Sequence, residues 1–269
     1  MKRSIAALVR NFRVSKRSGL LICFVFLIGL STGILLQRQG VPHFIKSYLV
    51  TGLGLSFSAK QMDDTSVLSL RVRKFNQSAE PSRFDTERDS SFTFKVIRLP
   101  VRETAVVLID VWASHPNDGW LERESQNVKD KVVPLLKAAR SAGLLIIHAP
   151  HGYSIHPLAK PHPGEVVLND YDADVVYAHL KRKGIKNLIY AGFASNWCVL
   201  GRPIGIIEAS KRGFNIVLVR DASIALETPE SLDGEWAHKM AVNLVEIHWG
   251  WTTTVDEFTE AVQAMKNVY

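Results

Sequence analysis

Residues 187–220 read NLIYAGFASNWCVLGRPIGIIEASKRGFNIVLVR, and this stretch decides the fold class. The short apolar run Asn187–Ala191 predicts a buried strand. Helical spacing follows over Trp197–Arg212 and ends at Gly213. A second apolar run, Asn215–Arg220, predicts the next strand. A strand, a helix and a strand in this order are typical of a right-handed crossover between parallel strands.

The same alternation of strands and helices extends over most of the chain. It predicts an α/β fold with a three-layer, Rossmann-like parallel sheet and helices on both faces. The further strands are expected at Thr104–Asp110, Leu144–His148, Glu165–Leu168 and, beginning a short one, Glu246–His248; the further helices are expected at Ser125–Ala142, Asp172–Lys183, Glu235–Leu244 and Val255–Met265.

The segments before this pattern suggest four parts. Residues 1–18 are basic, and residues 19–36 read GLLICFVFLIGLSTGILL, eighteen residues without a charge. Residues 37–91 show weak patterning and predict a juxtamembrane segment and linker. We therefore expect an α/β domain over residues 92–269.

The apolar run predicts a transmembrane helix, since its length approaches that needed to cross a bilayer. Six positive charges precede it, so the positive-inside rule puts residues 1–18 in the cytoplasm. The domain would then lie on the opposite side of the membrane. A cleaved signal peptide is the alternative, and it would leave a secreted or periplasmic protein.

The net charge of +7 does not indicate a nucleic-acid partner, because of where the charges lie. Nine positive charges fall within residues 1–62, before the first acidic residue, Asp63. Residues 63–269 therefore carry a net charge of −2. A mildly acidic domain gives no reason to expect binding to a phosphate backbone.

Two residues at predicted strand ends could carry chemistry. Cys198 lies in the first turn of the helix after the strand Asn187–Ala191, where free backbone N–H groups favour a thiolate and can hold an oxyanion. Asp110 ends another strand and could move a proton. In parallel sheets ligands bind beyond the carboxyl ends of strands, so Cys198 and Asp110 would face one site.

No GxGxxG or GxxxxGK sequence follows a strand, which argues against nucleotide chemistry.

The segments TAVVLIDVW and NLIYAGFASNWCVLGRPIGIIEASKRGFNIVLVRDAS resemble the isochorismatase-like cysteine hydrolases, which include nicotinamidases. The resemblance implies an Asp–Lys–Cys triad in which Cys198 is the nucleophile and Asp110 the general base. It also implies a cis peptide at Phe193–Ala194 and an oxyanion hole made by the N–H groups of Ala194 and Cys198.

The lysine of the triad is where this sequence departs from the family. The family's lysine ends the third strand, but here the residue at that place is Asn169. The nearest lysine is Lys160, just before the strand. Either Lys160 reaches the site through an altered loop, or the triad has lost its lysine.

Other residues near the same edge could line a pocket or hold a metal. Trp112, His115, Asn169 and Phe193 are candidate pocket residues. The resemblance implies no required cofactor, but relatives of the nicotinamidase type bind a divalent ion such as zinc. Imidazoles suit such ions, and the histidines near this edge are His115, His148, His151, His156 and His162.

Two functions follow from these observations. The first is a membrane-anchored amidase-type hydrolase that cleaves a small amide or carbamate C–N bond through an acyl-enzyme on Cys198. The second is a degenerate hydrolase domain that binds a small molecule or a protein without turnover. We expect a small-molecule substrate, membrane attachment through residues 19–36, and, as the family implies, a homo-oligomer.

Overall fold

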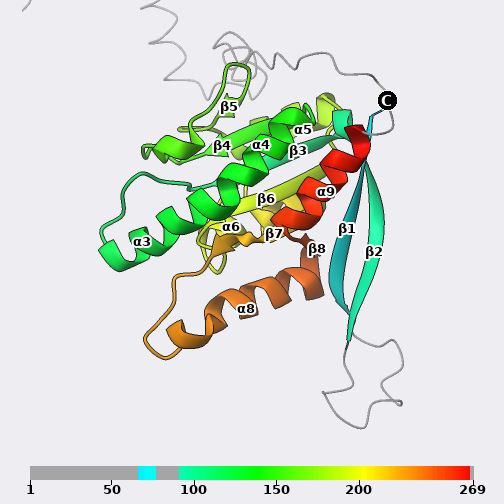
Figure 1. The fold of residues 1–269 in the computed structure, drawn as a ribbon. Coiled ribbons are helices and arrows are strands. Elements are labelled where there is room, and N and C mark those ends of the chain that lie inside the picture. The colour runs from blue at the N-terminus through cyan, green and yellow to red at the C-terminus, as the bar shows by residue number, and fades with distance from the viewer. Residues whose placement is uncertain (1–65, 77–90, 267–269) are drawn as a thin grey trace, which may run out of the picture. The chain divides into compact units, whose positions relative to one another are not determined.

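A computed structural model describes residues 66–76 and 91–266 of the chain, which form one mixed sheet covered by helices (Figure 1). The order of the strands is β2-β1-β8-β7-β6-β3-β4-β5. The strands are β1 (Val67–Asn76), β2 (Ser91–Pro100), β3 (Thr104–Ile109), β4 (Leu145–Ala149), β5 (Val166–Val167), β6 (Asn187–Phe193), β7 (Asn215–Ile224) and β8 (Gly250–Thr253).

Helices cover both faces of this sheet, as the sequence predicts. One buried cluster joins β1, β3 and β6 to the helices α3, α4 and α9, and the other joins β3, β6 and β7 to α5 and α7. Figure 1 shows α4 and α9 side by side over one face. The helices are α3 (Asp118–Asn127), α4 (Val133–Ser141), α5 (Ala173–Arg182), α6 (Cys198–Gly201), α7 (Ile206–Lys211), α8 (Trp236–Leu244) and α9 (Val255–Lys266).

The five strands β3, β4, β6, β7 and β8 are neighbours in a parallel arrangement, together with the short β5. The register places Ile109 of β3 beside Ala149 of β4 and Gly192 of β6. A side chain at Gly192 would lie 2.0 Å from the carbonyl oxygen of Ile109, so only glycine permits this close approach. The segments that follow these three strands therefore meet at one edge of the sheet.

The prediction of a linker over residues 37–91 is wrong for Val67–Asn76. This segment is the strand β1, which pairs antiparallel with β2 along its whole length and touches β8 at Arg73. Leu68, Leu70 and Val72 alternate with more exposed residues and are fully buried. That period of two is the signature of a half-buried strand. The domain therefore begins before Phe92, and its sheet is mixed rather than wholly parallel.

The helix expected at Trp197–Arg212 is broken into α6 and α7. Pro203 has no N–H to continue a helix. At Gly205, a Cβ would lie 2.8 Å from the carbonyl oxygen of Leu200, so the chain turns tightly there. The helix α6 is thus only four residues long and begins with Cys198.

The short strand expected to begin at Glu246–His248 is also wrong, because those residues lie in a π-helical segment, Val245–Trp249. Glu246 is fully buried, accepts a hydrogen bond from Nε of Arg73 at 2.8 Å, and also accepts one from Thr252. These contacts draw the end of α8 inward, and the strand β8 begins only at Gly250.

Each of the remaining helices and strands is of the type that the sequence predicts. The helix expected at Ser125–Ala142 runs from Asp118 to Ser141 and includes a π-helical segment, Val128–Val132. The predicted transmembrane helix lies outside the described residues. Within residues 66–76 and 91–266, no helix has the length and hydropathy needed to span a membrane.

Candidate active site

Asp110 follows directly after β3 at the edge where the strand ends meet. It has a positive φ of 49° and is 1% exposed. A non-glycine residue in the left-handed region is uncommon, and such strain concentrates at functional sites. The turn at Asp110 takes its carboxylate out of the strand direction and into the interior beside the neighbouring loops.

The side chains of Arg202 and His151 bind the carboxylate of Asp110. Arg202 donates from Nε to Oδ2 at 3.0 Å, and its Nη2 lies 2.9 Å from the same oxygen. Nδ1 of His151 lies 2.5 Å from Oδ1. Because Asp110 is buried, these partners supply the hydrogen bonds and the ion pair that water would otherwise supply to its carboxylate.

Cys198 reaches the same place from the loop after β6. The peptide bond Phe193–Ala194 is cis, as the resemblance implies. The carbonyl oxygen of Ala194 then accepts hydrogen bonds from the N–H groups of Trp197 and Val199. This tight turn places the thiol beside the carboxylate of Asp110, whose charge acts on it.

The thiol is not the pre-formed thiolate that its place at a helix start predicts. Burial raises the pKa of Cys198 to about 11, and the charge and hydrogen bond of Asp110 add to this effect. Arg202 and the N–H of Ala194 act in the opposite direction. The helix α6 is too short to offset a neighbouring carboxylate. The structure therefore has a protonated thiol beside an acceptor for its proton.

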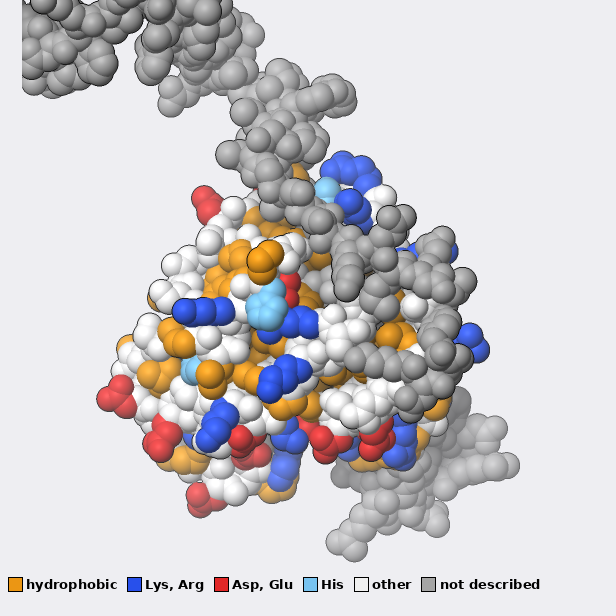
Figure 2. All heavy atoms as spheres, turned by 45° about the horizontal axis from the view of Figure 1, so that its top comes forward, with side chains coloured by type: hydrophobic (Ala, Val, Ile, Leu, Met, Phe, Trp, Pro, Cys, Tyr) orange, Lys and Arg blue, Asp and Glu red, His pale blue; other side chains and the backbone are white. Residues whose placement is uncertain are grey.

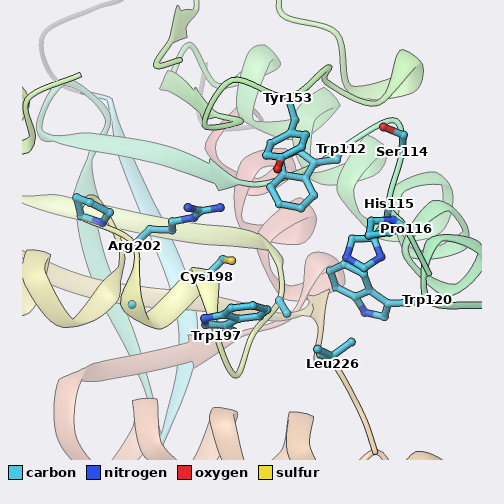
Figure 3. Close-up of a pocket in the computed structure, with 13 residues that line it drawn as sticks. Trp112, Ser114, His115, Pro116, Trp120, Tyr153, Trp197, Cys198, Arg202 and Leu226 are labelled. Atoms are coloured by element: carbon cyan, nitrogen blue, oxygen red, sulfur yellow. The ribbon is translucent and has the colours of Figure 1, made fainter. Parts of the chain in front are cut away.

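Cys198 opens into a cavity of about 500 Å³ whose walls are largely aromatic (Figure 3). Trp112 and Tyr153 lie against each other with ring centroids 4.4 Å apart, and His115 packs edge-on against Trp120 at 4.1 Å. Trp197 stands beside Cys198 at the mouth and is 67% exposed. The lining residues are Trp112, Ser114, His115, Pro116, Trp120, Tyr153, Ala194, Trp197, Cys198, Gly201, Arg202, Pro203 and Leu226.

The predicted pocket residues divide into two groups. Trp112 and His115 do line the cavity. Phe193 is fully buried in the core, and Asn169 is exposed; neither is among the lining residues.

Lys160 is not brought to the site. Its side chain is exposed, and its carbonyl oxygen accepts a hydrogen bond from Arg140. Among the described residues, the ion-pair partners of Asp110 are Arg202 and His151, and Lys160 is not one of them. The cation that the structure places beside Asp110 is Arg202, four residues after Cys198.

The histidines proposed as metal ligands do not converge. Nε2 of His148 lies 2.8 Å from Glu165, whereas His151 bonds Asp110 and His115 packs on Trp120. His156 caps the turn Pro157–Ala159, and His162 is exposed. In the part of the chain that the structure describes, no three His, Cys, Asp or Glu side chains form a set that could hold a metal ion. These residues therefore do not fit a metal centre.

Sequence reasoning missed one buried and one half-buried group that support the site. Glu124 of α3 is fully buried and accepts the N–H of Trp112 at 3.2 Å, while its Oε2 has no hydrogen-bond partner. Burial raises the pKa of Glu124 to about 8, against the effect of the Trp112 amide. Tyr171 lies behind His151, with its hydroxyl 2.8 Å from Nε2. Single residues of these types carry no sequence signal.

Hydrophobic side chains and scattered basic ones dominate one face of the molecule (Figure 2). Acidic side chains gather toward its lower margin in this view. This mixture agrees with the mild net charge of the domain and does not form a continuous basic track of the kind that binds nucleic acid.

A family model described as the isochorismatase domain matches residues 104–257, more than half of the chain. The chain therefore belongs to the isochorismatase family of hydrolases. Similar proteins include the ureidoacrylate amidohydrolase RutB of Variovorax paradoxus (strain S110), 26% identical over 125 residues, which covers 45% of this chain and 46% of that protein. The streptothricin hydrolase of Streptomyces noursei is 29% identical over 147 residues and covers 48% of this chain and 52% of that protein.

The chain thus spans about half the length of these two relatives. Among solved structures, a cysteine hydrolase from Pseudomonas syringae pv. phaseolicola 1448A matches with a TM-score of 0.50 and 15% identity. It covers 61% of this chain and 94% of that chain. At this identity the likeness shows the fold alone.

Proposed function

We propose that this protein is a cysteine hydrolase that cleaves a small amide or carbamate-type C–N bond. The observation that carries the proposal is that the thiol of Cys198 lies beside the buried carboxylate of Asp110, at the mouth of a cavity of about 500 Å³. A nucleophile and a base within hydrogen-bond reach are the signature of covalent catalysis. Relatives named as amidohydrolases support the choice of bond.

The first half of the reaction transfers an acyl group to Cys198. As the sulfur attacks the carbonyl carbon, the thiol proton moves to Asp110 and the carbonyl π electrons move to oxygen. The N–H groups of Ala194 and Cys198 would stabilise that oxyanion. The C–N bond then breaks, and the leaving nitrogen takes the proton from Asp110.

The second half returns the enzyme to its starting state. Water attacks the thioester carbon and gives a proton to Asp110. The C–S bond breaks, the acid leaves, and the proton returns to the sulfur of Cys198. A thiol pKa of about 11 suits this cycle, because transfer to Asp110 accompanies attack and no thiolate has to persist.

Arg202 would supply the positive charge that the family's lysine supplies elsewhere. Its guanidinium binds one oxygen of Asp110 through two nitrogens and also lines the cavity. Arginine stays charged at any working pH. It therefore keeps a cation beside the reacting atoms.

The test is a screen of small amides and carbamates against the purified full chain, with mass spectrometry of the protein during turnover. We expect release of the amine and an acyl adduct on Cys198 that Cys198→Ala does not form. An active Cys198→Ala protein, or turnover without any adduct when deacylation is slowed at low temperature, would overturn the proposal.

A non-catalytic binding domain is the second candidate, and one observation favours it. Among the described residues no lysine pairs with Asp110. Saturable binding of a small amide without release of its amine, under conditions in which Cys198 is reduced, would support this alternative.

Membrane attachment through residues 19–36 is a separate proposal, supported by the uncharged run and the positive charges before it. The full chain should sediment with membranes and resist carbonate extraction. Release of a shortened soluble chain during expression would favour signal cleavage instead.

A further inference from the structure

Another cavity, of about 160 Å³, lies where the strands β1 and β7 meet the helix α8. The described residues that line it include four basic side chains and no acidic one; they are Arg73, Arg220, His238, Lys239, Val242 and Asn243. None of them lines the cavity at Cys198. Pockets for drug-sized ligands have volumes of about 300–1,000 Å³, so this one suits a small group.

Two partly buried arginines of this cavity are held close together by one threonine. Thr252 of β8 is the register partner of Arg73, and its Oγ1 accepts a hydrogen bond from Nη1 of Arg220 at 3.3 Å. The side chains of Arg73 and Arg220 are 24% and 19% exposed. Two positive charges are therefore fixed near each other with little access to water.

The carboxylates behind the arginines compensate only part of this charge. Glu246 accepts a hydrogen bond from Nε of Arg73 at 2.8 Å. Glu257 lies 3.8 Å from Nη2 of Arg220, which is too far for a hydrogen bond. Burial and the charge of Arg73 lower the pKa of Arg220 below its usual value, against the opposite effect of nearby carboxylates. An anion in the cavity would stabilise both guanidinium groups.

The helix α8 supplies the other wall of the cavity. His238 and Lys239 lie one turn before Val242 and Asn243, so these four residues share one side of the helix. Lys239 is exposed, and its ammonium lies 4.7 Å from the centre of the Trp236 ring, with no carboxylate partner among the residues that the structure describes. A lysine on a flexible stem at the rim can turn its charge onto a bound anion.

We propose that this cavity binds a phosphate-type oxyanion, either as free phosphate or as the phosphate group of a larger molecule. Guanidinium groups donate in pairs to phosphate oxygens, and an ammonium adds a point charge. A phosphate monoester carries a charge of about −1.5 to −2 at pH 7. It therefore matches a cluster of two arginines and a lysine better than a singly charged carboxylate does.

The proposed anion site is separate from the part of the chain on which hydrolysis depends. Arg73 lies on β1, outside the family match at residues 104–257. Nδ1 of His238 lies 2.9 Å from Oγ of Ser195, a fully buried residue of the loop that leads to Cys198. A bound anion would thus lie behind that loop, and its binding needs no turnover.

The experiment is a titration of the purified full chain with inorganic phosphate and, separately, with glycerol phosphate, followed by calorimetry and by Tm. We expect saturable binding of one anion per chain and a rise in Tm, because a ligand that binds only the folded state stabilises it. Acetate at the same ionic strength is the control for screening by salt. Tighter binding of glycerol phosphate would assign the cavity to the phosphate group of a larger molecule, and tighter binding of phosphate would assign it to the free ion.

Lys239→Glu should weaken phosphate binding by about tenfold or more, because it replaces a positive charge at the rim with a negative one. Lys137→Glu, at an exposed position of α4, is the matched control and should bind phosphate as the wild type does. Both lysines are exposed, and an unchanged Tm without phosphate would show that the variants are folded.

Three results would overturn the inference. The first is the absence of saturable binding for both phosphate and glycerol phosphate, or an equal rise in Tm with acetate. The second is equal phosphate affinity of Lys239→Glu and the wild type. The third is binding that is lost in Arg202→Ala and retained in Lys239→Glu, which would place the anion in the cavity at Cys198. An inactive protein that binds phosphate as expected would refute the proposed hydrolase function alone.

Discussion

Arg202 binds Asp110 through two nitrogens on one carboxylate oxygen, with Nε at 3.0 Å and Nη2 at 2.9 Å from Oδ2. The aspartate is 1% exposed, so this contact stabilises a charge that water does not reach. Arg202 comes four residues after Cys198, and the break between α6 and α7 turns it back toward β3. A cation close in sequence to Cys198 thus lies beside the carboxylate of Asp110.

Arg202→Ala should lower kcat/KM on the order of 10²-fold, because the charge of Asp110 loses its strongest partner. Arg202→Lys should recover part of this loss, since an ammonium restores the charge without the planar two-nitrogen contact. Initial rates on the best amide from the screen measure both. Equal rates for Arg202→Ala and the wild type would show that the guanidinium has no part in the reaction.

Lys160→Ala is expected to leave kcat/KM within about twofold of the wild type, as is usual for a surface substitution away from a site. Its side chain is exposed, and Asp110 has other partners. Lys137→Ala, an exposed lysine of α4, is the matched control. A tenfold loss in Lys160→Ala alone would mean that its loop closes over the cavity during turnover.

Alkylation of Cys198 should be slow near neutral pH and should quicken only toward a pKa of about 11. Asp110→Asn should quicken alkylation at pH 8 by roughly tenfold or more, because it removes the negative charge and the acceptor that keep the thiol protonated. The same variant should lose hydrolase activity. Following the Cys198 peptide by mass spectrometry separates it from Cys23.

The control for that experiment is Asp118→Asn, an exposed aspartate at the start of α3, which should alkylate as the wild type does. Fast alkylation of the wild type, with a midpoint below the ~8.5 of a free cysteine, would contradict the buried, protonated thiol.

The sequence could predict the parallel core because its strands and helices each repeat a clear period. It could not predict β1, although Leu68, Leu70 and Val72 alternate, because a strand on the edge of that core has no adjoining helix to mark it. It also could not predict the π-helical end of α8. There the buried Glu246 meets Arg73, a residue 173 positions away.

The candidate site likewise contains residues that the sequence could identify and residues that it could not. Asp110 and Cys198 could be identified because each follows an apolar strand and matches a family motif. Arg202, His151 and Tyr171 could not be assigned, because their roles depend on distances between loops that the sequence does not encode locally. Lys160, the lysine nearest to the strand β5 in sequence, is exposed and does not reach Asp110.

Glu124 should make stability depend on pH. Burial raises its pKa from 4.5 to about 8, so the folded protein keeps a proton that the unfolded chain loses above pH 4.5. This contribution to stability is complete below that pH and is lost as the pH rises toward 8, at up to about 1.4 kcal/mol per pH unit. Glu124→Gln should flatten the dependence of Tm on pH between 5 and 8.

Glu122→Gln, on the exposed side of the same helix, is the control and should keep the wild-type dependence. Calorimetry at several pH values gives the comparison. A Tm profile unchanged by Glu124→Gln would mean that the carboxyl of Glu124 is ionised in the folded protein at neutral pH.

The strand β1 should be essential to the domain, although it lies outside the family match at residues 104–257. Removing it leaves the edge of β8 unpaired and uncovers the core cluster that Leu68, Leu70 and Val72 share with α9. A chain shortened to residues 92–269 should therefore aggregate or unfold at a much lower temperature than one shortened to residues 66–269.

Within the full chain, Leu70→Ala should cost about 2–5 kcal/mol of unfolding free energy, whereas Ser69→Ala, at an exposed position of the same strand, should cost less than about 0.5 kcal/mol. Equal stability of the two shortened chains in denaturant melts would show that β1 is an accessory to the sheet and that the hydrolase domain begins after it.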